Sequence, residues 1–217
     1  MIIDLHTHTF LSDGLLVPAE MIRRAEVAGY KAIALTDHVD SGNIEVVIKQ
    51  LLRICQDTSK YFSVKAIPGV EITHQPPQTI PKLVEEARAL GARLVTVHGE
   101  SPVEPVPPET NYLALQSDID FLAHPGLISD RELILAEERG IFLELTARCG
   151  HSLTNGYLVS AGRRYKLKFI INSDAHSHLE LLSQDLWRRV GLGAGLSEDE
   201  LKQVGKNSEE LLAKISD

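Results

Sequence analysis

The 217-residue chain is poor in cysteine, in aromatic side chains and in long hydrophobic runs. Its two cysteines, Cys55 and Cys149, are too few for a disulfide framework, so we expect a reducing, cytoplasmic environment. No apolar run approaches the ~18–20 residues that a membrane-spanning helix needs, and we expect no membrane association. A secretory signal is not expected either, because Asp4 stands where a basic segment would lie.

Basic residues are also outnumbered: 22 Lys and Arg stand against 30 Asp and Glu, which gives a formal net charge of -8. A chain of this charge lacks the basic surface of a general nucleic-acid binder. Bound divalent cations would nevertheless make one point of the surface attractive to anions. The length and the 43% of hydrophobic residues fit a single domain over residues 1–217 with a substantial core.

Short β-branched runs alternate with helical patterns along the chain. We predict strands at 2–6, 32–36, 64–68, 93–98, 119–123, 141–146 and 168–172. Helices are predicted at 18–28, 44–59, 81–90, 131–139 and 197–214; the last begins with Ser197 and Glu200, which resemble a capping box. Repeated strand–helix units predict a parallel sheet covered by helices, and we expect the last helix to pack on it.

Residues of the types that bind metals stand at the ends of six of the seven predicted strands. Strands at opposite edges of an open sheet, spaced about 4.8 Å per step, would keep these ends apart, whereas the carboxyl ends of barrel strands surround one centre. The pattern therefore favours a distorted, TIM-like (β/α)7 barrel with a multinuclear metal site at the C-terminal ends of its strands. The residues concerned are His6, His8, His38, Glu71, His98, His124, Asp174 and His176.

The residue types at these ends also indicate a chemistry. His6 and His8 project to the same face because side chains alternate along a strand, so both can bind one ion. Imidazole and carboxylate ligands suit zinc, iron or manganese, and a carboxylate such as Glu71 can bridge two cations. Two ions about 3.5–4 Å apart would then share a water, lower its pKa and supply hydroxide as the nucleophile.

Taken singly, several residues have simpler interpretations. Asp13, in a Ser-Asp-Gly sequence, fits a turn, and Asp174 fits the cap of a following helix. His74 and His178 look like loop or first-turn residues. Only the recurrence of such residues at successive strand ends favours a shared metal site.

Several motifs occur in an order that resembles the PHP family, the polymerase and histidinol phosphatase superfamily, from residue 1 to about residue 190. The resemblance implies a distorted (β/α)7 barrel with up to three metals and an activity centred on phosphoester hydrolysis. The motifs are His6-Thr7-His8-Thr9 with Ser12-Asp13-Gly14, Thr36-Asp37-His38, Pro68-Gly69-Val70-Glu71, Val97-His98-Gly99, Ala123-His124-Pro125-Gly126 and Ser173-Asp174-Ala175-His176.

The resemblance also implies how the ligands are shared among two or three divalent ions, and it makes Glu71 and Asp174 the catalytic candidates. All nine ligand positions are filled by competent residues, which argues against a degenerate copy. The first metal would take His6, His8, Glu71 and Asp174, the second Glu71, His98 and His124, and the third Asp13, His38 and His176.

Together these inferences predict a phosphoric monoester hydrolase for a small phosphorylated metabolite, histidinol-phosphate-like or nucleotide-like. Two alternatives stay open. One is a non-catalytic module that supports a polymerase or another partner. The other is an amidohydrolase-like hydrolysis of a C–N or ester bond, although no lysine follows a predicted strand at a ligand position, as it does in many amidohydrolases.

Residues after the sixth predicted strand should border the same opening. Arg148 offers a bidentate fork for phosphate, and His151 could donate a proton to the substrate; the simpler interpretation is a surface ion pair and a loop histidine. Two proline-rich segments, 74–81 and 101–108, follow strands that bear ligands. They are either stiff surface loops or a lid.

Overall fold

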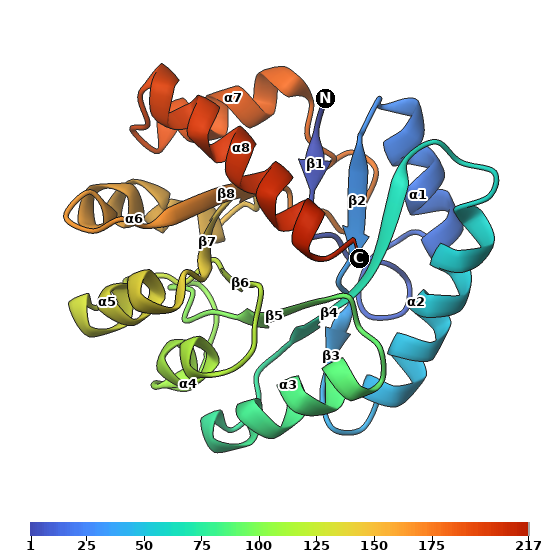
Figure 1. Cartoon of the computed structure of the whole chain (residues 1–217), viewed down its shortest axis with the longest axis horizontal. Helices are drawn as coiled ribbons and strands as arrows, with labels where there is room; N and C mark the ends of the chain where they lie inside the picture. The colour runs from blue at the N-terminus through green and yellow to red at the C-terminus, as the bar shows by residue number, and fades with distance from the viewer. Residues whose placement is uncertain (217) are drawn as a thin grey trace.

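Seven parallel strands form a nearly closed barrel with helices outside it (Figure 1). The structure, a computed structural model, describes residues 1–216. Each strand pairs in parallel with the next one along the path, in the order of the chain. They are β1 (Ile3–Asp4), β2 (Ala32–Leu35), β4 (Lys65–Ile72), β5 (Leu94–His98), β6 (Phe121–Ala123), β7 (Phe142–Thr146) and β8 (Lys168–Asn172); a short strand, β3 (His38–Val39), pairs with β4. The predicted barrel is confirmed.

The barrel closes where its first and last strands meet. A parallel bridge joins Thr7 to Ala175, and the backbone N–H of His8 donates to the carbonyl of Ala175 at 2.8 Å. Nearer the N-terminal ends of the two strands, the side-chain oxygen of Asn172 accepts the backbone N–H of Leu5 at 2.9 Å. This seam turns the sheet into a ring.

The helices surround the ring, and none in residues 1–216 is both long and apolar enough to cross a bilayer. Five of them match predicted segments, and the capping box of Ser197 with Glu200 is confirmed. The helices are α1 (Pro18–Val27), α2 (Ile44–Thr58), α3 (Ile80–Ala89), α4 (Thr110–Gln116), α5 (Asp130–Arg139), α6 (Asn155–Gly162), α7 (Gln184–Gly193) and α8 (Glu198–Lys214), with short 3-10 turns η1 (Pro77–Thr79) and η2 (His151–Thr154).

Inside the barrel, side chains change from apolar to polar toward the C-terminal ends of the strands. On β7, Phe142 is followed two residues later by Glu144, and on β8 Ile170 is followed by Asn172, as the two-residue period requires. The apolar layer forms one hydrophobic cluster with Leu211 of α8. The end of α8 therefore covers the N-terminal mouth of the barrel, and the polar layer lies toward the other end.

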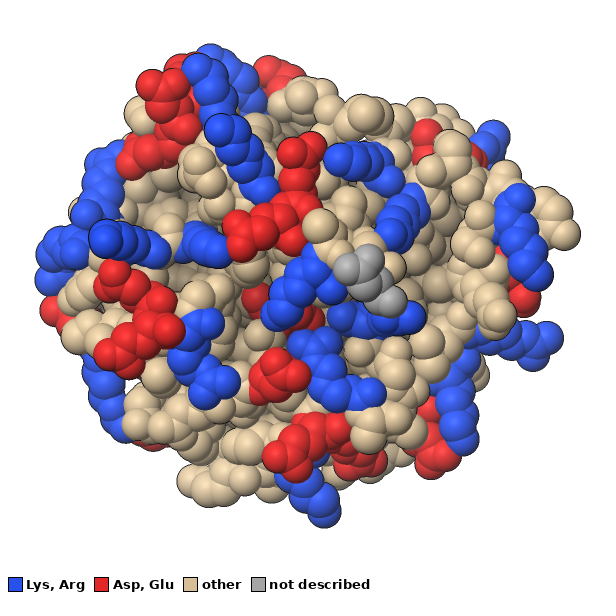
Figure 2. Space-filling view, in the orientation of Figure 1, with Lys and Arg blue, Asp and Glu red and all other residues tan. Residues whose placement is uncertain are grey.

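Figure 2 shows the face that α8 crosses, on which basic and acidic side chains lie interspersed. Lys31 lies 3.2 Å from Glu209, and Lys168 lies 2.5 Å from Glu210, so two ion pairs join α8 to the strands' N-terminal ends. All four side chains are substantially exposed, so each pair adds little to stability.

The largest difference from the predicted elements concerns β4. The expected strand ended at Pro68. In the structure β4 continues to Ile72. It pairs with β2 as far as Pro68, and beyond Pro68 it pairs with β3 instead. Glu71 consequently lies within a strand and not after it. The first strand, expected at 2–6, is limited to Ile3–Asp4.

Three helices, α4, α6 and α7, and the strand β3 were not predicted. The α6 helix begins with Asn155-Gly156, a pair typical of turns. The α4 helix has no side-chain cap and follows prolines at 107 and 108. The α4 and α6 segments thus lack the start signals on which sequence prediction depends. The α7 helix does have one, because Oγ of Ser183 accepts the backbone N–H of Leu186 at 3.1 Å.

Candidate metal centre

The structure brings all nine predicted ligands together at the C-terminal end of the barrel. They come from β3, β4 and β5 and from the segments that follow β1, β6 and β8. Six are buried and three lie nearer the opening, with the side chain of Asp13 54% exposed. The buried ones are His6, His8, Glu71, His98, His124 and Asp174; the outer ones are Asp13, His38 and His176.

Glu71 lies at the middle of this arrangement. Its Oε2 is 3.3 Å from Nε2 of His6, 3.5 Å from Nε2 of His8 and 2.9 Å from Nδ1 of His38. Its Oε1 is 3.4 Å from Nε2 of His124. One buried carboxylate thus faces four imidazoles, as expected of a group shared between two cations.

Asp174 faces three of these imidazoles, those of His6, His8 and His124. Its Oδ1 lies 3.2 Å from Nε2 of His8 and 3.9 Å from Nε2 of His6. Asp174 has φ 54°, and His124 has φ 25°. Non-glycine residues rarely adopt this left-handed conformation, and such strain is concentrated at functional sites.

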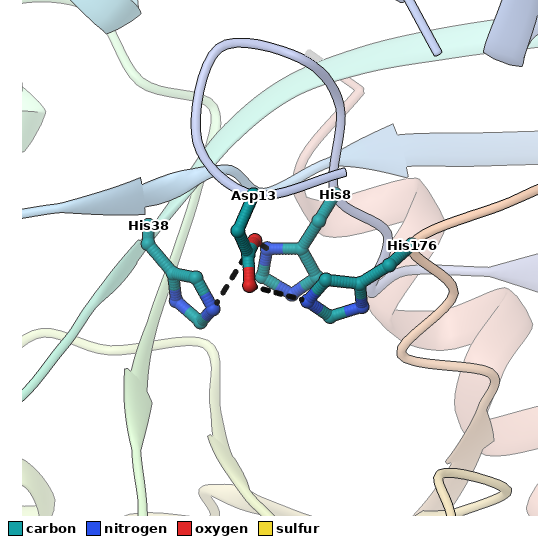
Figure 3. A group of neighbouring side chains, drawn as sticks. All are labelled: His8, Asp13, His38 and His176. Carbon is teal, nitrogen blue, oxygen red and sulfur yellow. Dashed lines mark ion pairs between the residues drawn. The ribbon is translucent and has the colours of Figure 1, made fainter. Parts of the chain in front are cut away.

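A second cluster lies at the opening, where Asp13 faces His8, His38 and His176 (Figure 3). Oδ2 of Asp13 is 3.1 Å from Nε2 of His176, and Oδ1 is 3.7 Å from Nε2 of His38. The predicted turn holds Asp13 in place: a Cβ on Gly14 would lie 2.3 Å from the carbonyl oxygen of His8, so only glycine allows this close return.

The arrangement fits divalent cations because buried polar atoms at its centre lack hydrogen-bond partners among residues 1–216. They are Nε2 of His6, both ring nitrogens of His8 and both oxygens of Glu71, with Nδ1 of His124. An unsatisfied buried polar atom costs about 1–3 kcal/mol, so a protein rarely keeps several together. Bonds of about 2.0–2.1 Å to a tetrahedral ion place its ligands about 3.3 Å apart, which matches the separations around Glu71 and Asp174.

The protonation states of Glu71 and His8 fit as well. Burial works to raise the pKa of Glu71, but His6 and His38 outweigh it and hold that pKa well below its usual range. Burial and the neighbouring His38 hold the pKa of His8 well below its usual range. Metal binding requires an ionised carboxylate and a neutral imidazole, which Glu71 and His8 provide. Burial works to lower the pKa of His6, but Glu144 and Glu71 outweigh it and raise that pKa well above its usual range, so a cation bound there would displace a proton. The clusters are those of a polynuclear metal site.

Glu144 of β7 supports this centre, although the sequence analysis did not single it out. Its Oε1 accepts from Nδ1 of His6 and from the amide of Asn172, both at 2.8 Å, and its Oε2 accepts the backbone N–H of His124 at 3.1 Å. Since a carboxylate can only accept from His6 Nδ1, Nε2 is left to face Glu71. A glutamate between two leucines on a predicted strand is the signal that could have identified it.

A family model described as PHP domain matches residues 4–212. The chain belongs to the PHP family. An uncharacterised protein of Methanocaldococcus jannaschii, MJ1295, is 45% identical over 203 residues, 93% of each chain. The 5'-3' exoribonuclease Rnm of Salmonella typhimurium is 36% identical over only 73 residues, 34% of this chain and 23% of that protein.

Solved structures with the same fold include PHP-type phosphatases. One, described as YwqE from Bacillus subtilis and CpsB from Streptococcus pneumoniae, metal-dependent tyrosine phosphatases, has a TM-score of 0.65 at 20% identity and covers 98% of this chain and 95% of its own. The histidinol phosphate phosphatase of Lactococcus lactis, solved with zinc, L-histidinol and phosphate, has a TM-score of 0.60 at 15% identity, with 89% and 94% covered. At these identities the likeness shows the fold alone.

Of the two predicted substrate contacts in this PHP chain, His151 lies at the centre and Arg148 beside it. The ring of His151 stacks on His124 with centroids 4.2 Å apart, and its Nδ1 is 2.5 Å from Oγ of Ser101. Burial lowers the pKa of His151 to about 3, so it is neutral. Nη1 of Arg148 pairs with Glu180 at 3.0 Å; Glu180 also accepts the backbone N–H of the predicted ligand His176.

Both proline-rich segments border this PHP centre and contribute residues that the prediction missed or set aside. Glu104, in the segment 101–108, lies 3.1 Å from Nε2 of His98, and Nε2 of His74 donates to it at 2.9 Å. Only the position of Glu104 six residues after His98, in a loop expected to border the site, could have pointed to it. These contacts favour a role at the site over plain surface loops.

Proposed function

We propose that this PHP chain is a metal-dependent phosphoesterase that hydrolyses a small phosphorylated metabolite, histidinol-phosphate-like or nucleotide-like. One observation carries the proposal. The buried strand ends present unpartnered imidazole nitrogens and carboxylate oxygens at the separations of atoms that share a cation. Membership of the PHP family supports it.

Three groups of residues would hold two or three zinc, manganese or iron ions. When bound, such ions lower the pKa of water and neutralise phosphoryl oxygens. The groups are His6, His8, Glu71 and Asp174; Glu71, His98 and His124; and Asp13, His38 and His176.

The chain's own side chains would position the ions, transfer protons and bind the substrate. Glu71, common to two groups, fixes their spacing. Burial raises the pKa of Asp174, which suits it to accept the proton of the attacking water. His151, neutral and held by Ser101, is placed to donate a hydrogen bond to a substrate oxygen, and Arg148 to bind a phosphate oxygen after leaving Glu180.

The test is turnover by metal-free protein reconstituted separately with manganese, zinc and iron. Histidinol phosphate, nucleoside monophosphates and bisphosphates, and p-nitrophenyl phosphate form the panel. We expect hydrolysis of at least one ester well above the rate with free metal, and its loss in Glu71→Gln. Activity on none of them with any metal would refute the proposal.

Nucleotide substrates have a specific observation in their favour, the partial match to an exoribonuclease. A supporting module without catalysis would instead leave Glu71→Gln changed only in metal content or stability. Hydrolysis of a C–N bond would appear as activity on dipeptides or amides and not on phosphate esters. We also place the chain in the cytoplasm, because both cysteines are free.

A further inference from the structure

Glu104 lies at the point where three histidines outside its own loop converge. Its Oε2 is 3.1 Å from Nε2 of His98 and 2.9 Å from Nε2 of His74, and its Oε1 is 3.3 Å from Nε2 of His151. His98 and His151 are buried, whereas the side chain of Glu104 is 38% exposed. The loop between β5 and α4 thus directs one carboxylate inward from the surface.

The contact with His98 needs a positive charge between its two atoms. Nδ1 of His98 lies 3.1 Å from the carbonyl oxygen of Gly99, which can only accept, so the ring proton lies on Nδ1. Nε2 then presents a lone pair to a carboxylate oxygen 3.1 Å away. Two acceptors at this distance repel unless a proton or a cation lies between them.

The separation is that of two ligands of one ion, about 3.3 Å for a tetrahedral cation. His98 also packs edge-on against His124, with ring centroids 4.5 Å apart. These two histidines, with Glu71, are the residues proposed above for the second cation. Glu104 approaches the same nitrogen of His98 from the side of the solvent.

We propose that Glu104 is a further ligand of the cation held by His98 and His124, and that it gives way to a phosphate oxygen when substrate binds. Only the second part of this proposal, the displacement of Glu104 by a phosphate oxygen, rests on the proposed function. His74 donates to Glu104 and orients it, as residues hydrogen-bonded to metal ligands commonly do. The partial exposure of Glu104 distinguishes it from the buried strand-end ligands, because an exposed carboxylate can leave without exposing the barrel interior.

The first test titrates manganese into metal-free protein without substrate, by calorimetry. In Glu104→Gln and Glu104→Ala we expect one class of bound manganese to weaken by about tenfold or more. Glu109→Gln is the matched control: it lies at the end of the same loop, and its carboxylate lies 3.5 Å from Arg131, so its titration should equal that of the wild type. Unchanged manganese affinity in both Glu104 variants would overturn the proposal.

The second test measures inorganic phosphate binding to manganese-saturated protein. Removal of a competing carboxylate should strengthen phosphate binding in Glu104→Ala by about tenfold, while Glu109→Gln stays as wild type. Equal phosphate affinity would overturn the displacement. The manganese titration contains no substrate. It can therefore support Glu104 as a ligand even if no phosphoester is hydrolysed, and it can exclude Glu104 as a ligand in an enzyme that turns over well.

Discussion

Glu144 shows how one buried side chain can hold together three separate parts of the barrel, two of which carry proposed ligands. It is fully buried, yet its two oxygens accept from His6, from Asn172 and from the backbone of His124. His6 and His124 belong to two different proposed ion positions. A change at Glu144 should therefore disturb metal binding without removing any ligand.

We predict that Glu144→Gln weakens manganese binding by about 10–100-fold, since carboxylates behind metal-bound histidines commonly contribute that much. The amide can still bond His6, but it carries no charge to favour the ring's orientation. Calorimetric titration of metal-free protein measures the effect. The exposed Glu85 of α3 provides the control, and equal affinities for Glu144→Gln and Glu85→Gln would contradict the prediction.

Asp4 gives a pH-dependent prediction at the same scale. It is fully buried, and burial raises its pKa from 3.8 to about 6. Because the folded pKa lies above the unfolded one, the stability it contributes is present below pH 3.8 and is lost as the pH rises through about 6.

Asp4→Asn removes this loss while keeping an acceptor for the N–H of Ser173, which lies 3.1 Å from Asp4 Oδ1. The free energy of unfolding of the variant, minus that of wild type, should rise by about 1 kcal/mol between about pH 5 and about pH 7.5. Urea unfolding of metal-free protein at both pH values measures it. A difference that stays constant with pH would show that Asp4 ionises normally.

At the scale of elements, the sequence predicted a strand or helix correctly where its hydrophobic pattern and the residues at its end agree. The strand that ends at His98 and the strand that precedes Asp174 were found because β-branched runs stop at polar residues. Sequence prediction failed where tertiary pairing decides the element, as for β3, which exists only through pairing with β4. Glu104 was missed for the same reason, since only the folded loop brings it to His98.

A capping box closes the first turn of α8. Ser197 Oγ accepts the N–H of Glu200 at 3.2 Å, and Oε2 of Glu200 accepts the N–H of Ser197 at 2.7 Å. We predict that Ser197→Ala lowers the free energy of unfolding by about 1 kcal/mol and leaves manganese affinity unchanged. Ser160→Ala, at an exposed site of α6, is the control in denaturant unfolding. Equal stabilities would show that the cap contributes nothing.

For the whole molecule, the barrel and its proposed cations should stabilise each other. Ligands come from both ends of the chain and from the strands between, so the unfolded chain offers no comparable site. Binding at about 100 times the dissociation constant adds about 2.7 kcal/mol per ion.

Chelation should accordingly lower the Tm by about 5–10 °C for each ion removed, and added manganese should restore it. Thermal unfolding followed by fluorescence, with chelator and then with excess manganese, is the measurement. Magnesium, which prefers oxygen ligands, serves as the comparison ion. A Tm that changes with neither chelator nor manganese would argue against any tightly bound ion.

The seam that joins Thr7 to Ala175 also has a consequence for synthesis of the protein. His6 and His8 leave the ribosome before Asp174 and His176, which emerge roughly ten to thirty seconds later at ~5–20 residues per second. A nascent chain therefore displays two histidines long before their acidic neighbours exist. We expect the metal ions to bind after translation. The metal content of a molecule would then show whether its chain had been completed.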